Sequence, residues 1–229
     1  MVAMIIDTHD TGKKTVFITA LTIGALWGIF ESTLGYLLHL LPVNLGFLVW
    51  YPIACYFLTK AYRESGRASA VLLTAMFASL IKLFNLILPG RIDQVLNPAV
   101  SIIFEGIAVW AAVFIFHRMH ARMKNSRWLT AALALGANSL WRVLFALYLA
   151  VAVPGWVRDI SVIRSVDTFL HFMIVDNLAG GVVAWLGFQA LKRAKDKLKP
   201  GTPIFNVPAA GRMAGLLIAS AIGLQLLLR

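Results

Sequence analysis

The stretch NPAVSIIFEGIAVWAAVFIF at residues 97–116 decides the fold class. Only Glu105 is charged in it, and Asn97 followed by Pro98 is typical of a helix cap and a first helical residue. A helix needs about 20 mainly apolar residues to cross the hydrocarbon core of a bilayer. Residues 97–116 therefore predict a transmembrane helix that carries one carboxylate.

Similar apolar runs recur along the chain, at 15–41, 46–62, 68–88, 128–153, 165–190 and 207–228. The composition agrees with them, because 60% of the 229 residues are apolar, 14% are charged and the mean hydropathy is +0.80. A soluble domain has about 45–50% apolar and about 25% charged residues. We therefore expect an all-α, polytopic transmembrane bundle of six or seven helices. The composition excludes a water-soluble enzyme and a disordered chain.

These runs divide the chain into four parts. We expect an N-terminal tail over 1–14 and a six-helix transmembrane core over 15–192. A basic linker over 193–206 and a seventh apolar helix over 207–229 follow. Arg212 interrupts the first turn of that last helix, which makes it the least regular of the predicted spans.

Basic residues are distributed unequally between the two sides of the predicted spans. Fifteen of the 21 Lys and Arg residues fall on the side of the N-terminal tail and the basic linker. The remaining six are Arg91, Arg158, Arg164 and Arg229 on the other side, and Lys82 and Arg142 within spans. Cytoplasmic loops carry the excess of Lys and Arg, so we expect a cytoplasmic N-terminus in a cell inner membrane. The net charge of +11 then reports topology, and no nucleic-acid partner is expected.

Several ionisable and amide side chains fall inside the expected spans, where a charge costs a few kcal/mol or more unless it is paired, lines a cavity or binds a ligand. These are Glu31, Lys82, Asn85, Glu105, Asn138, Arg142, His171 and Asp176. Lys82 lies seven residues before Pro89, and Glu105 lies seven residues after Pro98. At about 1.5 Å per residue both lie about 10 Å below the same turn, which predicts an ion pair between them.

Helical spacing suggests how these side chains meet a ligand. Residues three or four apart share a face, which pairs Trp27 with Glu31, Lys82 with Asn85, and Asn138 with Arg142. We expect a cavity open to the outer side, in which Lys82 and Arg142 bind anionic groups, Glu31 and Glu105 accept hydrogen bonds, and Trp27 stacks on a flat ring. The alternative is that the charges only join helices as ion pairs.

The predicted span over 165–190 has a further pattern. Asp167 and His171 are four residues apart and share a face, whereas Asp176 lies on the opposite side of a regular helix from Asp167. We therefore expect His171 and Asp176 to contribute separately to the ligand cavity. No metal site and no cofactor are predicted.

Two stripes of small residues are spaced four apart: Ala20, Gly24, Gly28 and Ser32 in the first span, and Gly211, Gly215, Ala219 and Gly223 in the last. Such stripes let helices approach closely in lipid. They serve either internal packing or the docking of another membrane protein, and the last helix is the favoured surface for a dimer or a partner.

The core over 15–192 resembles an S component, the substrate-capture subunit of energy-coupling-factor vitamin transporters. The resemblance rests on small size, basic charge, polar residues toward the outer half and the stripe Ala20, Gly24 and Gly28, which resembles the family's docking helix. It implies capture of a vitamin or similar micronutrient from the outer side, with import driven by a separate membrane coupling subunit and its ATPase. The absence of GxxxxGK[ST] from the sequence agrees with a separate ATPase. A seventh span departs from the six of the family.

Two other function classes remain open. Cys55, Arg142 and His171 occur in the order of exosortase-like transpeptidases, although Cys55 lacks the Ser-Gly that follows the cysteine in that family. The other class is a stand-alone ion-coupled carrier with Glu31, Glu105 and Asp176 as coupling carboxylates, which requires a homo-oligomer.

Overall fold

The computed structural model describes residues 12–39, 46–87, 91–120 and 127–197, and side chains within 12–31, 50–87, 91–119 and 128–190. Every regular element in these ranges is helical. The long helices are α2 (Lys13–His39), α3 (Gly46–Ser65), α4 (Ser69–Leu83), α5 (Asp93–His120), α6 (Arg127–Val151) and α9 (Asp176–Lys197). The short elements are the 3-10 helix η1 (Phe84–Ile87), α7 (Gly155–Arg158), α8 (Val166–Leu170) and the π-helix η2 (His171–Val175).

Five helices in the described ranges are long and apolar enough to cross a membrane. They are Lys13–Glu31, Ser69–Ile87, Asp93–Met119, Trp128–Val151 and Val166–Ala190. Helix α3 is not among them, because Pro52, several tyrosines and three charged residues near its end lower its hydropathy. The all-α prediction is confirmed for the described residues. The predicted span over 207–228 lies outside them, as do the basic linker from residue 198 and most of the N-terminal tail.

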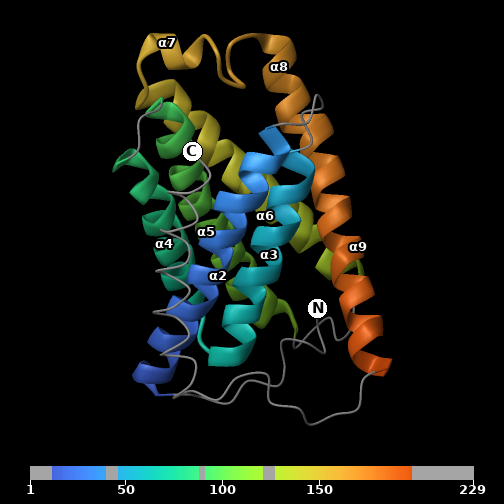
Figure 1. Cartoon of the computed structure of the whole chain (residues 1–229). Helices are drawn as coiled ribbons and strands as arrows, with labels where there is room; N and C mark the ends of the chain where they lie inside the picture. The colour runs from blue at the N-terminus through green and yellow to red at the C-terminus, as the bar shows by residue number, and fades with distance from the viewer. Residues whose placement is uncertain (1–11, 40–45, 88–90, 121–126, 198–229) are drawn as a thin grey trace.

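The long helices stand side by side and close into a ring, in which the neighbours follow the order α2, α4, α5, α6, α9, α3 and back to α2 (Figure 1). Helix α3 also contacts α4 and α5, so it lies toward the inside of the bundle. Its residues Tyr51, Ala54, Leu58 and Ala61 are all at most 1% exposed. The most polar long helix is thus the one that its neighbours cover best.

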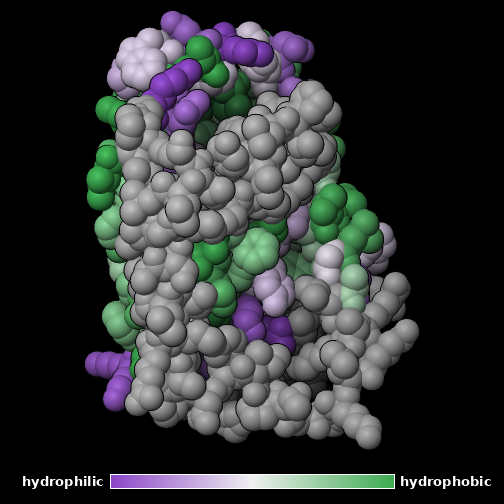
Figure 2. All heavy atoms as spheres, viewed as in Figure 1, coloured by the Kyte–Doolittle hydropathy of each residue, from purple (hydrophilic) through white to green (hydrophobic). Residues whose placement is uncertain are grey.

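The surface matches a bundle with apolar flanks. Large apolar side chains are exposed along α9, among them Leu178, Val182 and Leu186, each about half exposed. Figure 2 shows apolar residues on the flank formed by α4 and hydrophilic residues gathered at the end that carries α7 and α8. This distribution is that of a protein whose sides face lipid and whose ends face water.

Local signals explain where some helices end. Helix α3 ends at Ser65, and Gly66 follows with φ of 69° while its N–H donates to the Tyr62 carbonyl at 2.8 Å. Glycine takes this left-handed conformation without a Cβ clash and terminates the helix. At the start of α8, the Ser165 hydroxyl accepts from the Thr168 N–H, and the Thr168 hydroxyl accepts from the Ser165 N–H, which forms a capping box.

The helix that contains Glu105 begins earlier than the Asn97-Pro98 signal predicts. Helix α5 starts at Asp93 and includes Pro98. Asp93 in the first turn interacts favourably with the positive end of the helix and is also held by Arg91, whose Nη2 lies 2.8 Å from Oδ2. These interactions extend the helix by about one turn before the proline.

The stripe Ala20, Gly24 and Gly28 packs inside the chain. A Cβ at Gly24 would lie 2.8 Å from the Thr74 carbonyl oxygen, and one at Gly28 would lie 2.9 Å from the Ile81 side chain. Both contacts are to α4, and Ala20 is fully buried. The expectation that this stripe offers an open docking face is therefore wrong. The second stripe, from Gly211 to Gly223, lies outside the described residues.

Candidate functional site

A pocket of about 570 Å³ lies at the end of the bundle that carries α7 and α8. It is bounded by the start of α5, the last turns of α6, the segment 160–164, α8, η2 and the start of α9. We call it the end pocket. Its lining residues are Asp93, Gln94, Asn97, Pro98, Phe145, Leu149, Ile160, Ser161, Val162, Arg164, Asp167, Thr168, His171, Phe172 and Asp176.

The lining of the end pocket is divided by polarity. Apolar groups come from α6 and η2, where Phe145, Leu149 and Phe172 are all at most 9% exposed. Phe145 and Phe172 pack at a centroid distance of 6.4 Å. Charged and amide groups come from α5, α8 and the segment between α7 and α8. The pocket therefore offers an aromatic and aliphatic wall opposite several hydrogen-bonding groups, the usual make-up of a small-molecule site.

Two of the predicted site residues meet in this pocket. His171 Nδ1 lies 3.4 Å from Asp176 Oδ1, and both residues line the end pocket. The expectation that they lie apart is wrong, because it assumed a regular α-helix. Residues 171–175 form a π-helix, in which the hydrogen bond joins residues five apart and stacks them on one face.

Arg142 and Asn138 lie next to this pocket without lining it. Arg142 is fully buried, and its Nη1 and Nη2 donate to the carbonyls of Phe172 at 2.9 Å and Asp176 at 3.2 Å. The Asn138 amide donates to the Asn177 carbonyl at 2.7 Å and accepts from Trp141 Nε1 at 2.7 Å. Both side chains are thus engaged by protein groups, and their predicted contact with a ligand stays a prediction.

The predicted residues on α2, α4, η1 and α5 lie away from the end pocket. These are Trp27, Glu31, Lys82, Asn85 and Glu105. Trp27 is 1% exposed and stacks on Phe57 at 6.5 Å, and its Nε1 has no hydrogen-bond partner among the described residues. Their role in ligand binding also stays a prediction.

The predicted ion pair between Lys82 and Glu105 is not formed. Neither Glu31 nor Glu105 makes a hydrogen bond or salt bridge with a described residue, although they are 9% and 5% exposed. Lys82 acts electrostatically on Glu31, and Arg142 acts on Glu105. Depth along the helix placed these charges at similar levels, but the rotation of each helix about its axis decides which of them face one another.

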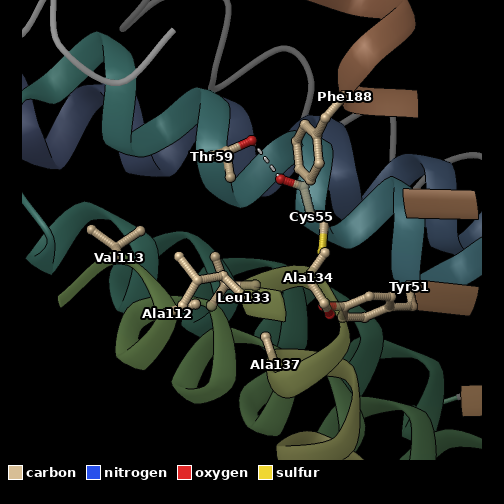
Figure 3. A pocket seen from close by; sticks show the side chains of 10 residues that line it. Tyr51, Cys55, Thr59, Ala112, Val113, Leu133, Ala134, Ala137 and Phe188 are labelled. Carbon is tan, nitrogen blue, oxygen red and sulfur yellow. Dashed lines mark hydrogen bonds between the residues drawn. The ribbon is translucent and has the colours of Figure 1, made fainter. Parts of the chain in front are cut away.

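A second, apolar pocket of about 20 Å³ contains the cysteine. It lies between α3, α5, α6 and α9, and its lining includes Cys55, Val109, Leu133 and Phe188 (Figure 3). Beside Cys55, the Tyr51 hydroxyl donates to the Ala134 carbonyl at 2.6 Å. Cys55 and His171 line different pockets, so the structure does not assemble the cysteine and histidine of a transpeptidase.

We expect Cys55 to be chemically inert in the folded protein. Its side chain is 3% exposed in an apolar pocket, which denies reagents access and disfavours the reactive thiolate. N-ethylmaleimide added to the protein in detergent should leave the mass unchanged, and addition after unfolding in SDS should add one label. The Cys55→Ser variant should retain ligand like the parent protein. Rapid labelling of the folded protein, or loss of function in the serine variant, would contradict this assignment.

Several residues of the end pocket escaped the sequence reasoning as ligand contacts. Asp93, Asn97, Arg164 and Asp167 lie at the ends of apolar runs, where they were interpreted as caps, topology signals or a helical pair. A usable signal was present, because Arg164, Asp167 and Thr168 form a polar cluster next to His171. Among the described residues, no group of three or more His, Cys, Asp and Glu side chains is arranged to hold a metal ion.

Comparison of the chain with protein-family models, with curated proteins and with solved structures found no match. The functional argument therefore rests on the geometry of the end pocket and on the physical chemistry of its lining.

Proposed function

We propose that this chain is a substrate-binding subunit of the cell inner membrane that captures a small polar micronutrient from the outer side. The end pocket is the single observation that carries this proposal. At about 570 Å³ it falls within the usual range of small-molecule sites, about 300–1,000 Å³. Energy for transport is proposed to come from a separate coupling subunit with its ATPase, or from a homo-oligomer that works as an ion-coupled carrier.

The proposed orientation supports capture from outside. Helix α2 begins with Lys13 and Lys14, and the end pocket lies at the opposite end of the bundle (Figure 1). The excess of Lys and Arg on the side of the N-terminus places that side in the cytoplasm. In this arrangement α3 is the sixth crossing of the core, shielded from lipid by the helices around it, and the end pocket opens outward.

The lining also suggests the general shape of the ligand. Phe145, Leu149 and Phe172 favour a molecule with an aromatic or aliphatic face. Asn97, Arg164 and Asp167 supply a donor and acceptor set on other sides of the pocket. A compact molecule with a ring and several polar substituents matches both parts, which agrees with a vitamin-like micronutrient.

Native mass spectrometry of the detergent-purified protein tests the proposal. We expect the parent protein to retain a small molecule, and the variant with Asp167→Asn and His171→Gln to retain at least tenfold less of it, because both residues line the end pocket. The matched control is Asp159→Asn, an exposed aspartate near the pocket that does not line it, which should retain the molecule like the parent.

A third variant separates the end pocket from the buried charges near α2 and α4. Glu31→Gln with Lys82→Met changes two predicted ligand contacts that lie outside the end pocket. Loss of the adduct only in this variant would move the site to those charges and overturn the assignment to the end pocket. Absence of any adduct from a folded parent protein supplied with cell extract would overturn the capture function itself.

A further inference from the structure

The wall of the end pocket that carries His171 and Asp176 depends on an irregular helical turn. In a regular α-helix, residues five apart point in directions that differ by about 140°. Here the Asp176 N–H donates to the His171 carbonyl, which is the hydrogen bond of a π-helix. The wider turn places His171 and Asp176 on one face, with Nδ1 and Oδ1 3.4 Å apart.

A π-turn displaces carbonyl groups from the regular ladder, and those groups need donors from elsewhere. The structure supplies two of these donors from Arg142 on α6. Its Nη1 and Nη2 donate to the carbonyls of Phe172 and Asp176, which are the second residue of η2 and the residue directly after it. The guanidinium carbon also lies 4.4 Å from the centre of the Phe172 ring.

We propose that Arg142 is a positioning residue for the end pocket: by binding the carbonyls of Phe172 and Asp176, it stabilises the π-turn that brings His171 and Asp176 to one wall. The planar guanidinium suits this task, since it presents two donors in a fixed fork. Asn138 assists one residue further along, where its amide donates to the Asn177 carbonyl. The inference rests on the proposed function only in taking this wall as part of a ligand site.

Copper binding by paired histidines tests the turn directly. The Asp176→His variant places an imidazole five residues from His171, and the Val175→His variant places one four residues away. The probe is Cu²⁺–iminodiacetate, followed by its affinity and by the electron paramagnetic resonance signature of two imidazole ligands. With Arg142 present, we expect both variants to bind the probe at least tenfold more tightly than the parent protein, which has His171 alone at this place.

The variants are then combined with Arg142→Gln. We expect the pair at 171 and 176 to lose at least tenfold in copper affinity, because the turn relaxes toward an α-helix and separates the two positions. The pair at 171 and 175 should keep its affinity, since residues four apart share a face of an α-helix. Retention of both pairs, or equal loss of both in a folded protein, would overturn the proposal, because the effect would then not be specific to the π-turn.

Arg142→Lys provides the measurement if the glutamine variant does not fold. A single ammonium cannot reproduce a fork that reaches two carbonyls, so we expect at least a threefold loss at 171 and 176 and no change at 171 and 175. Equal copper affinities in the lysine variant and the parent background would overturn the proposal. None of these measurements uses the natural ligand, so their failure leaves the retention experiment unaffected, and the two proposals fail separately.

Discussion

Replacing Gly106 by valine is expected to destabilise the bundle by about 3 kcal/mol, at the upper end of the usual cost of overpacking. A Cβ at Gly106 would lie 2.4 Å from the Ala75 Cβ, a distance that real Cβ atoms do not adopt. Helices α4 and α5 would have to separate along their contact. Unfolding of the detergent-purified protein by SDS, followed by circular dichroism, measures the loss.

The partner of this contact provides an internal check. Ala75→Gly removes the methyl group that Gly106→Val meets, so the double variant should recover part of the lost stability, with a coupling energy of at least about 1 kcal/mol. Gly136→Val is the matched control, because a Cβ at Gly136 meets nothing within 4 Å, and we expect it to change stability by about 0.5 kcal/mol or less. Equal effects of the two valine substitutions would show that helix propensity, not contact with α4, determines the outcome.

The second large effect is expected for Asn138→Leu, at about 3 kcal/mol. Asn138 is fully buried, donates to the Asn177 carbonyl, and accepts from Trp141 Nε1 and, at 3.4 Å, from Arg142 Nε. Leucine preserves the approximate size but removes the partner of three groups, and each buried group left without one costs about 1–3 kcal/mol. The same SDS unfolding assay measures the change.

Asn97→Leu is the control for that substitution. Asn97 accepts one hydrogen bond, from the Tyr148 hydroxyl at 3.2 Å, and is only partly buried. We expect a loss of about 1 kcal/mol or less, close to the average of single interhelical hydrogen bonds in membranes. If Asn138→Leu were no more destabilising than this control, the polar contact between α6 and α9 would not contribute the stability assigned to it.

The helical class follows from the sequence because hydropathy acts locally. A run such as 97–116 satisfies its own backbone hydrogen bonds and presents apolar side chains all round, whatever its neighbours are. Helix α3 shows where this reasoning is incomplete. Its polar residues lower its hydropathy, yet its burial depends on four neighbouring helices that no local window includes.

The candidate site was predicted only in part. His171 and Asp176 were recognised as ionisable residues within an apolar run, and both line the end pocket. Their pairing was missed because the 3.6-residue period holds only for a regular helix, and the π-turn at 171–175 receives two of its hydrogen bonds from Arg142, about 30 residues away in the sequence. Asp93 and Arg164 were missed because their chemistry depends on which helix ends meet.

The sequence by itself determined the helical, membrane-type character of this protein and the positions of its apolar helices, since both depend on the transfer of each segment between water and lipid. It also identified which charges are costly inside such a bundle. Only the tertiary structure decided which charges face one another, that the stripe of Gly24 and Gly28 packs inward on α4, and that a pocket forms beside α7 and α8. The physical reason is that helix rotation, close approach and the widening of one turn are set by contacts between segments that are distant in the sequence.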